Sequence, residues 1–246
     1  MATVGSSHLL TQRLQAKYIK AELESLINDA LLIDPALAKR LDELRRWIKD
    51  KKVGLLTRKP LLLDFVSELI LDTRLWLKLK QLPSQEKQRF LEKAQMTQAE
   101  KYWYEFLFPQ WFNECDPKLD TWKSKMMSGE YTQQDVRLIN ALSAQIESSG
   151  GACLWRYIID LSMATDLLTS GNSDEPLCVQ MTISSPEWLA NKKDHWEATL
   201  RYWGITRGLL LSVNPKNLDD NLSLLADAIL QKGESLPESC YDLHIY

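Results

Sequence analysis

Hydrophobic positions recur at three- and four-residue steps through most of the first half of the chain. Between His8 and Ile33 the apolar residues fall on one face of a helix, and Asp34-Pro35 ends that helix and starts the next. The same spacing continues downstream, with Pro, Ser, Thr or Asp as start signals. We therefore predict helices over residues 8–33, 36–50, 60–81, 84–95, 97–112 and 117–127.

After Gly129 the pattern changes to short apolar runs separated by turn-like segments. A helix is predicted over 132–149, and Gly150-Gly151 ends it. The runs that follow are rich in β-branched, aromatic and aliphatic residues, which predicts strands over 153–160, 163–170 and 176–183. Next come a helix over 185–203, a continuous apolar strand over 207–213, a helix over 217–233 and a polar tail that we expect to be loose.

This order of elements predicts two domains of an α+β or α/β protein. Residues 1–129 form an all-helical domain, and residues 130–246 form a domain with a mixed sheet. A strand–helix–strand crossover implies a parallel pair of strands, whereas a tight turn between strands implies an antiparallel hairpin. The second domain therefore combines both kinds of pairing, with helices on both faces of the sheet.

Composition and charge narrow the function classes. With 246 residues, 45% of them hydrophobic, the chain is long enough to bury a core. It has no run of 18 apolar residues, and its N-terminus lacks the features of a secretory signal, so we expect a cytoplasmic protein without membrane contact. The four cysteines form no Cys-x-x-Cys or Cys/His cluster, which indicates neither a zinc site nor a disulfide framework.

The second domain carries a polar pattern that resembles a known family. An acid, Asp166, lies in its second predicted strand, and the third contains V-Q-x-T, with Gln180 and Thr182. Together with the succession α-β-β-β-α-β over residues 130–230, this pattern resembles the core of the PD-(D/E)XK nuclease superfamily, a restriction-endonuclease-like fold. In that family the second strand supplies an Asp, the third an (Asp/Glu)-x-Lys triplet, and the preceding helix often a Glu.

The resemblance implies a variant metal site. Asp166 takes the first position, and Gln180 takes the second, as in Mrr-type members, so that these two are the expected metal ligands. Glu147 matches the helix acid. Thr182 stands at the Lys position, and Lys192 or Lys193 on the following helix is the candidate for a displaced cation.

The chemistry of these residue types explains the expectation. Carboxylates bind Mg²⁺, which stabilises charge on the phosphate and lowers the pKa of an attacking water, and the Lys orients that water. Gln retains an oxygen ligand but removes one negative charge, which weakens a metal site. Mg²⁺ is therefore the cofactor if the site is active, and no cofactor is expected otherwise. In the alternative interpretation Asp166 caps a turn, and the polar edge of Gln180 and Thr182 faces a covering helix.

Nucleic-acid binding has a second source of support in the helical half. Residues 1–130 contain 22 Lys/Arg and 18 Asp/Glu, whereas residues 131–246 contain 8 and 15. Residues 39–59 alone contain nine Lys/Arg against three Asp/Glu. Such a cluster is suited to phosphate contacts, although basic helix faces are also ordinary solvated surface. The candidate DNA-binding residues are Arg45, Arg46, Lys49, Lys51 and Lys52.

Nine tryptophans leave two interpretations open, because indole rings either stack on bases or fill a core. The overall hypothesis is a nuclease-like protein that binds or cleaves DNA through a variant site. The alternative is a catalytically inactive scaffold that uses the same fold and binds a protein partner through its helical half. DNA binding would fall steeply with salt, whereas protein-directed association would tolerate it.

Overall fold

The computed structural model describes residues 14–49, 56, 59–131, 136–171, 176–183, 186–214 and 218–246. The chain divides into two compact units, Met1–Met96 with Tyr104–Tyr131, and Thr97–Trp103 with Thr132–Tyr246. The sequence placed the domain boundary at 129/130 and kept 97–103 in the helical domain. In the structure the corresponding division is at 131/132, and 97–103 belongs to the unit that contains the sheet.

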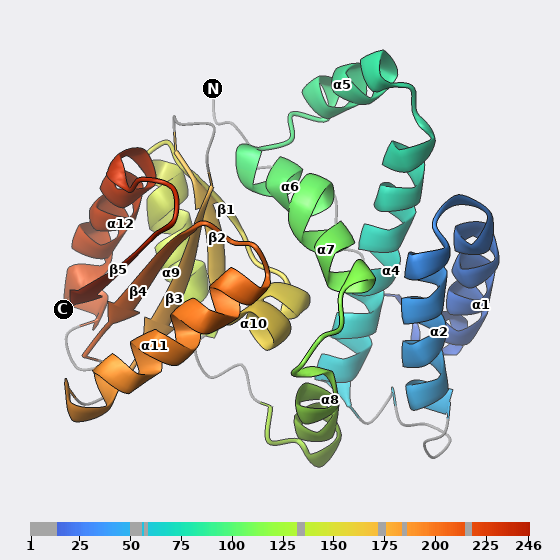
Figure 1. The fold of residues 1–246 in the computed structure, drawn as a ribbon, viewed down its shortest axis with the longest axis horizontal. Helices are drawn as coiled ribbons and strands as arrows, with labels where there is room; N and C mark the ends of the chain where they lie inside the picture. Colours follow the sequence, from blue (N-terminus) through green and yellow to red (C-terminus); the bar gives the residue numbers. More distant parts are fainter. Residues whose placement is uncertain are drawn as a thin grey trace. The chain divides into compact units, whose positions relative to one another are not determined.

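The first unit is helical, as its periodicity predicts. Its helices are α1 (Ala16–Ile33), α2 (Pro35–Lys49), α4 (Pro60–Gln81), α5 (Ser84–Lys93), α7 (Phe108–Asn113) and α8 (Leu119–Ser128) (Figure 1). The prolines that open α2 and α4 occupy the first helical position, where a missing N–H costs no hydrogen bond. Residues 8–13 and 50 of the predicted helices lie outside the described residues.

The helix predicted over 97–112 is interrupted. Its first part, α6 (Gln98–Tyr102), starts at a capping box in which Thr97 and Glu100 each accept a hydrogen bond from the other's backbone N–H. A π-helical turn, Trp103–Leu107, then leads into α7. Pro109 in α7 has no N–H to donate to the carbonyl four residues earlier, so regular α-helical bonding cannot continue through this point. The chain passes from one unit to the other within this π turn.

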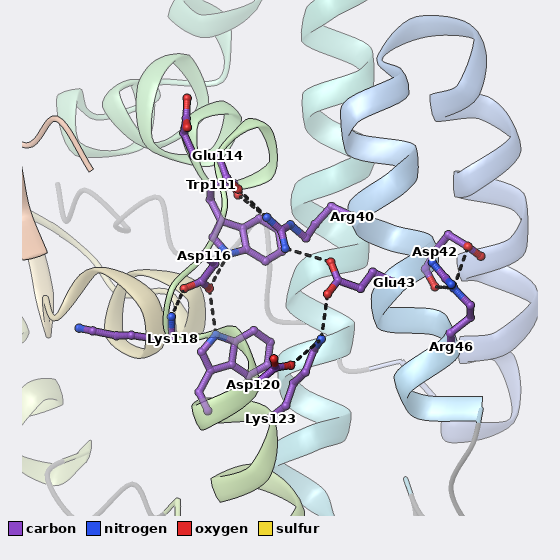
Figure 2. A network of polar contacts seen from close by, with 11 residues as sticks. Arg40, Asp42, Glu43, Arg46, Trp111, Glu114, Asp116, Lys118, Asp120 and Lys123 are labelled. Carbon is purple, nitrogen blue, oxygen red and sulfur yellow. Dashed lines mark hydrogen bonds and ion pairs between the residues drawn. The ribbon is translucent and has the colours of Figure 1, made fainter. Parts of the chain in front are cut away.

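A buried polar network connects three elements of the helical unit (Figure 2). Arg40 of α2 donates to the Glu43 carboxylate at 3.0 Å and to the carbonyl oxygens of Trp111 and Glu114 at 3.3 and 2.6 Å. Its guanidinium also lies over the Trp111 ring. Lys123 of α8 donates to the other Glu43 oxygen at 3.1 Å. The network therefore links α2 to the end of α7 and to α8.

Asp116, in the connection between α7 and α8, is the second centre of this network. Its Oδ2 accepts hydrogen bonds from the indole N–H groups of Trp111 and Trp122 at 3.3 and 3.0 Å, and its Oδ1 accepts from the Lys118 backbone N–H at 2.9 Å. Asp116 and both indoles are buried. One carboxylate thus supplies the acceptor for three donors, two of which have no access to water.

The second unit contains a five-stranded mixed sheet in the order β1-β2-β3-β4-β5. The strands are β1 (Ala152–Leu154), β2 (Leu167–Ser170), β3 (Leu177–Thr182), β4 (Arg207–Ser212) and β5 (Cys240–Ile245). The pairs β1/β2 and β2/β3 are antiparallel, and β3/β4 and β4/β5 are parallel. The accompanying helices are α6, α9 (Val136–Ser148), α10 (Tyr157–Met163), α11 (Pro186–Tyr202) and α12 (Leu218–Ser235).

Two predictions in this unit were wrong. The strand expected over 153–160 ends at Leu154, and Tyr157–Met163 forms α10 instead. Its β-branched pair, Ile158 and Ile159, favours a strand locally, but both side chains are buried in the helical conformation, and burial outweighs propensity. The polar tail expected to be loose forms the edge strand β5, whose side chains are only half buried and so show no clear alternation.

The two faces of the sheet are covered by different helices (Figure 1). Val179, Met181, Leu209 and Leu211 point to the same side and pack in one core with the apolar faces of α9 and α12. Gln180 and Thr182 alternate with these residues along β3 and belong to the opposite face. The polar residues singled out in the sequence therefore lie on the side of the sheet away from α9.

Helix α11 lies close against β4 on that opposite face because Gly208 has no side chain. A Cβ at Gly208 would lie 2.4 Å from the Leu200 Cδ1 and 2.8 Å from the Trp196 Cη2. The indole N–H groups of Trp196 and Trp203 donate to the carbonyl oxygens of Ala164 and Ser162 at 3.1 and 2.9 Å. These contacts fix the position of α11, and with it the position of its polar side chains.

Candidate phosphate-binding site

Asp166 and Gln180 are direct neighbours across β2 and β3. The register pairs Leu167 with Val179, so Asp166, one residue before β2, stands opposite Gln180. The Asp166 N–H donates to the Val179 carbonyl at 2.8 Å. Its Oδ2 accepts hydrogen bonds from the Gln180 amide at 2.8 Å and from the Met181 backbone N–H at 2.6 Å. The Asp166 carboxylate thus accepts a backbone N–H of β3 at a position that lies beyond the first residue of β2.

Thr182 and Lys192 complete the cluster. Thr182 follows Gln180 on the same face of β3 and is buried, and the Lys192 ammonium of α11 donates a hydrogen bond to its Oγ1. An ammonium group therefore reaches the side chain that stands at the Lys position of the resemblance. We call Asp166, Gln180, Thr182 and Lys192 the β3 cluster.

Two further sequence candidates lie outside the β3 cluster. Lys193 of α11 forms an ion pair with Glu197, one turn further along the same helix, at 3.1 Å. Glu147 is exposed on α9, whose apolar face packs against the side of the sheet opposite to Gln180. The structure therefore brings together Asp166, Gln180 and Lys192, but not Glu147 or Lys193.

The donor set of the β3 cluster does not fit a Mg²⁺ site. Mg²⁺ is bound by oxygen ligands, usually with one or two carboxylates. Here Gln180 presents its amide N–H₂ to Asp166 and also to the Met181 carbonyl, 3.0 Å away, rather than its oxygen. Among the residues that the structure describes, no group of three or more His, Cys, Asp or Glu side chains is arranged to bind a metal ion.

The basic segment of the helical unit is largely engaged in internal ion pairs. Arg45 contacts Asp42 at 2.5 Å and Glu24 at 3.9 Å. Arg46 contacts Asp42 at 3.1 Å (Figure 2). The hydrogen bond from Arg45 is the largest influence that lowers the pKa of the Asp42 carboxyl below its usual value. Both arginines therefore already have an anionic partner on the protein, which weakens the case for phosphate contacts there.

The other basic candidates of this segment lie outside what the structure describes. Lys49 is the last residue of α2, but its side chain falls outside the described residues, as do Lys51 and Lys52. Their role in DNA binding remains a sequence-based expectation.

A cavity of about 550 Å³ lies in the helical unit beside the Arg40 network. Its charged lining consists of Lys39, Arg40, Glu43, Glu114, Asp116 and Asp120, so acids outnumber bases by two. An excess of negative charge disfavours phosphate binding. This cavity is therefore a poorer candidate for nucleic acid than the β3 cluster.

The tryptophans differ in how far they are buried. Trp103, Trp111, Trp122, Trp196 and Trp203 are buried, which favours their interpretation as core residues. Trp188, in the first turn of α11, is instead 67% exposed. The sequence held a signal for this difference, because Trp188 lies eight residues before Trp196 and so is rotated about 80° from it around the helix.

The thiols offer no reactive group near this site. Burial raises the pKa of Cys178, on β3, to about 12, and burial likewise raises the pKa of Cys153, on β1, to about 12. Both remain protonated near neutral pH, and a protonated thiol is neither a good nucleophile nor a metal ligand.

In a comparison with known proteins, no family model, no curated protein and no solved structure matches the chain. Within the described part of the chain, no helix is both long and apolar enough to cross a membrane.

Proposed function

We propose that the sheet-containing unit is a nuclease-like domain of the PD-(D/E)XK type that binds DNA at the β3 cluster without metal-dependent cleavage. The observation that carries the proposal is the contact of the Lys192 ammonium with Thr182, beside the Asp166–Gln180 pair. The succession α9, β1, β2, β3, α11, β4 gives further support, because it contains the α-β-β-β-α-β order of that family. The insertion of α10 between β1 and β2 departs from this order.

The charge balance of the β3 cluster favours phosphate binding without a metal. Two carboxylates and one lysine carry a net charge of −1 and need a cation before a phosphate can approach. With Gln180 in place of the second acid, Asp166 and Lys192 balance each other. An ammonium has three N–H donors, so its bond to Thr182 leaves it able to donate to a phosphate oxygen as well.

The alternative function is a catalytically inactive scaffold that binds a protein partner. It is favoured by the structural use of Asp166, whose carboxylate accepts a backbone N–H of β3 as a strand-stabilising residue would. A scaffold would associate with its partner through contacts that tolerate salt. The two functions therefore differ in an observable way.

The proposal is tested by measuring the anisotropy of a fluorescent oligonucleotide with the full chain in EDTA over a series of NaCl concentrations. We expect binding without a divalent ion, weakening steeply as salt rises. We also expect no nicking of plasmid DNA with Mg²⁺ or Mn²⁺. The absence of DNA binding would overturn the proposal in favour of the scaffold. Nicking that disappears in Asp166→Ala would instead show a working nuclease.

A further inference from the structure

The exposed indole of Trp188 lies near the proposed phosphate contact. Trp188 and Lys192 are four residues apart on α11, so they share a face of the helix and are separated by about 6 Å along its axis. Ile183, which directly follows Thr182, is also 60% exposed. Exposed apolar side chains therefore flank the β3 cluster at the point where the chain leaves β3 and enters α11.

We infer that Trp188 stacks on an unpaired base of a DNA strand whose phosphate binds Lys192. This inference rests on the proposed function and names its substrate class, single-stranded DNA. The phosphate and the base of one nucleotide are separated by a distance similar to one helical turn, so a single nucleotide can contact both side chains. The indole face stacks on any base, whereas the bases inside a duplex have their faces covered by their neighbours.

The tryptophans further along, one in α11 and one directly after it, explain why Trp188 is available for this role. Trp196 and Trp203 are buried, and their N–H groups donate to the backbone near α10. They attach the C-terminal part of the helix to its unit. Trp188 is at the opposite end of α11, with two thirds of its surface open to solvent. Its replacement should therefore leave the fold of the unit intact.

The test measures the affinity of the full chain, as wild type and as Trp188→Ala, for a labelled DNA single strand. The same measurement is made on strands that lack the base at one position after another and on a strand that lacks all bases. Loss of one stacked base should weaken binding about 5- to 150-fold. Trp188→Phe should recover much of this loss because it keeps an aromatic face, whereas Trp188→Leu should not. The slope of log K against log salt should be unchanged in Trp188→Ala, since no charge is removed. Tyr202→Ala, at the far end of α11, is the matched control, and we expect little change.

Three results would overturn the inference. Wild-type affinity in Trp188→Ala would show that the indole does not contact the strand. An equal loss for fully abasic DNA would show that the indole does not stack on a base. In either case the proposed function stands if the salt slope still depends on Lys192. If wild type binds no DNA at all, both the proposed function and this inference fail.

Discussion

Gln180→Glu is expected to create a metal site at the β3 cluster and to destabilise the protein when no metal is present. In wild type the Gln180 Nε2 donates a hydrogen bond to the Asp166 Oδ2 at 2.8 Å. The variant places a second carboxylate at this contact. Two adjacent carboxylates supply the oxygen ligands that Mg²⁺ and Mn²⁺ bind. Calorimetric titration with Mn²⁺ should show binding to the variant that wild type lacks.

The stability of Gln180→Glu should depend on metal and on pH. The change removes the hydrogen bonds to Asp166 and to the Met181 carbonyl and adds like-charge repulsion, a loss of about 3 kcal/mol at pH 8. A proton shared by the two carboxylates restores the Asp166 contact, so the deficit should shrink as the pH falls toward 5. Saturation with metal to a hundred times its Kd should return about 2.7 kcal/mol.

Gln180→Met provides the matched control, because it removes the hydrogen bonds without adding a charge or a ligand. Its thermal unfolding should be lowered to a similar extent at pH 5 and pH 8, and Mn²⁺ should not raise it. If Gln180→Glu were as stable as wild type, and insensitive to metal, the Asp166–Gln180 contact would have no energetic importance.

The second large effect is expected in the helical unit. Asp116→Ala should lower its free energy of unfolding by about 3 kcal/mol or more, because a buried donor left without an acceptor costs about 1–3 kcal/mol. The buried donors are the indole N–H groups of Trp111 and Trp122, and the partly buried Lys118 backbone N–H loses the same acceptor. Denaturant unfolding followed by tryptophan fluorescence measures this loss.

Asp120→Ala controls for the charge removed in Asp116→Ala. Asp120 lies in the first turn of α8, is fully exposed and contacts Lys123 at 3.8 Å. Its replacement should leave the stability nearly unchanged, because an exposed ion pair contributes little. Equal effects of the two substitutions would contradict the account of Asp116 as the common acceptor of the buried network.

Much of the fold follows from local pattern. Pro60 starts α4 and Gln81 ends it, as spacing and start signals predicted. The strands β3 and β4 coincide with the apolar runs that turn residues delimit, whereas β2 forms only the second half of the strand predicted over 163–170. The failures occur where tertiary burial decides, as in Tyr157–Met163, or where an edge strand is polar, as in Cys240–Ile245. Helical periodicity does not predict the π turn at Trp103–Leu107, because this turn depends on how the chain continues into α7 around Pro109.

The site was only partly predictable for a related reason. The two-residue period of a strand places Gln180 and Thr182 on one face, and this inference needs no tertiary information. Neighbouring lysines differ by about 100° around a helix, and only the docking of α11 decides that Lys192 is the one that meets Thr182. The ion pair of Lys193 with Glu197 follows from their four-residue spacing on the same helix. The pairing of Asp42 with Arg45 and Arg46 was readable from their three- and four-residue spacing.

The most direct test of the proposed site compares Lys192→Ala with Lys193→Ala. Both variants remove one positive charge from adjacent positions of the same helix, but only Lys192 contacts Thr182. The quantity to measure is the slope of log K against log salt for oligonucleotide binding in EDTA. We predict that Lys192→Ala reduces the magnitude of this slope by about 0.7–0.9 and weakens binding, whereas Lys193→Ala leaves the slope at its wild-type value. Equal slopes for wild type and both variants would contradict a phosphate contact at the β3 cluster.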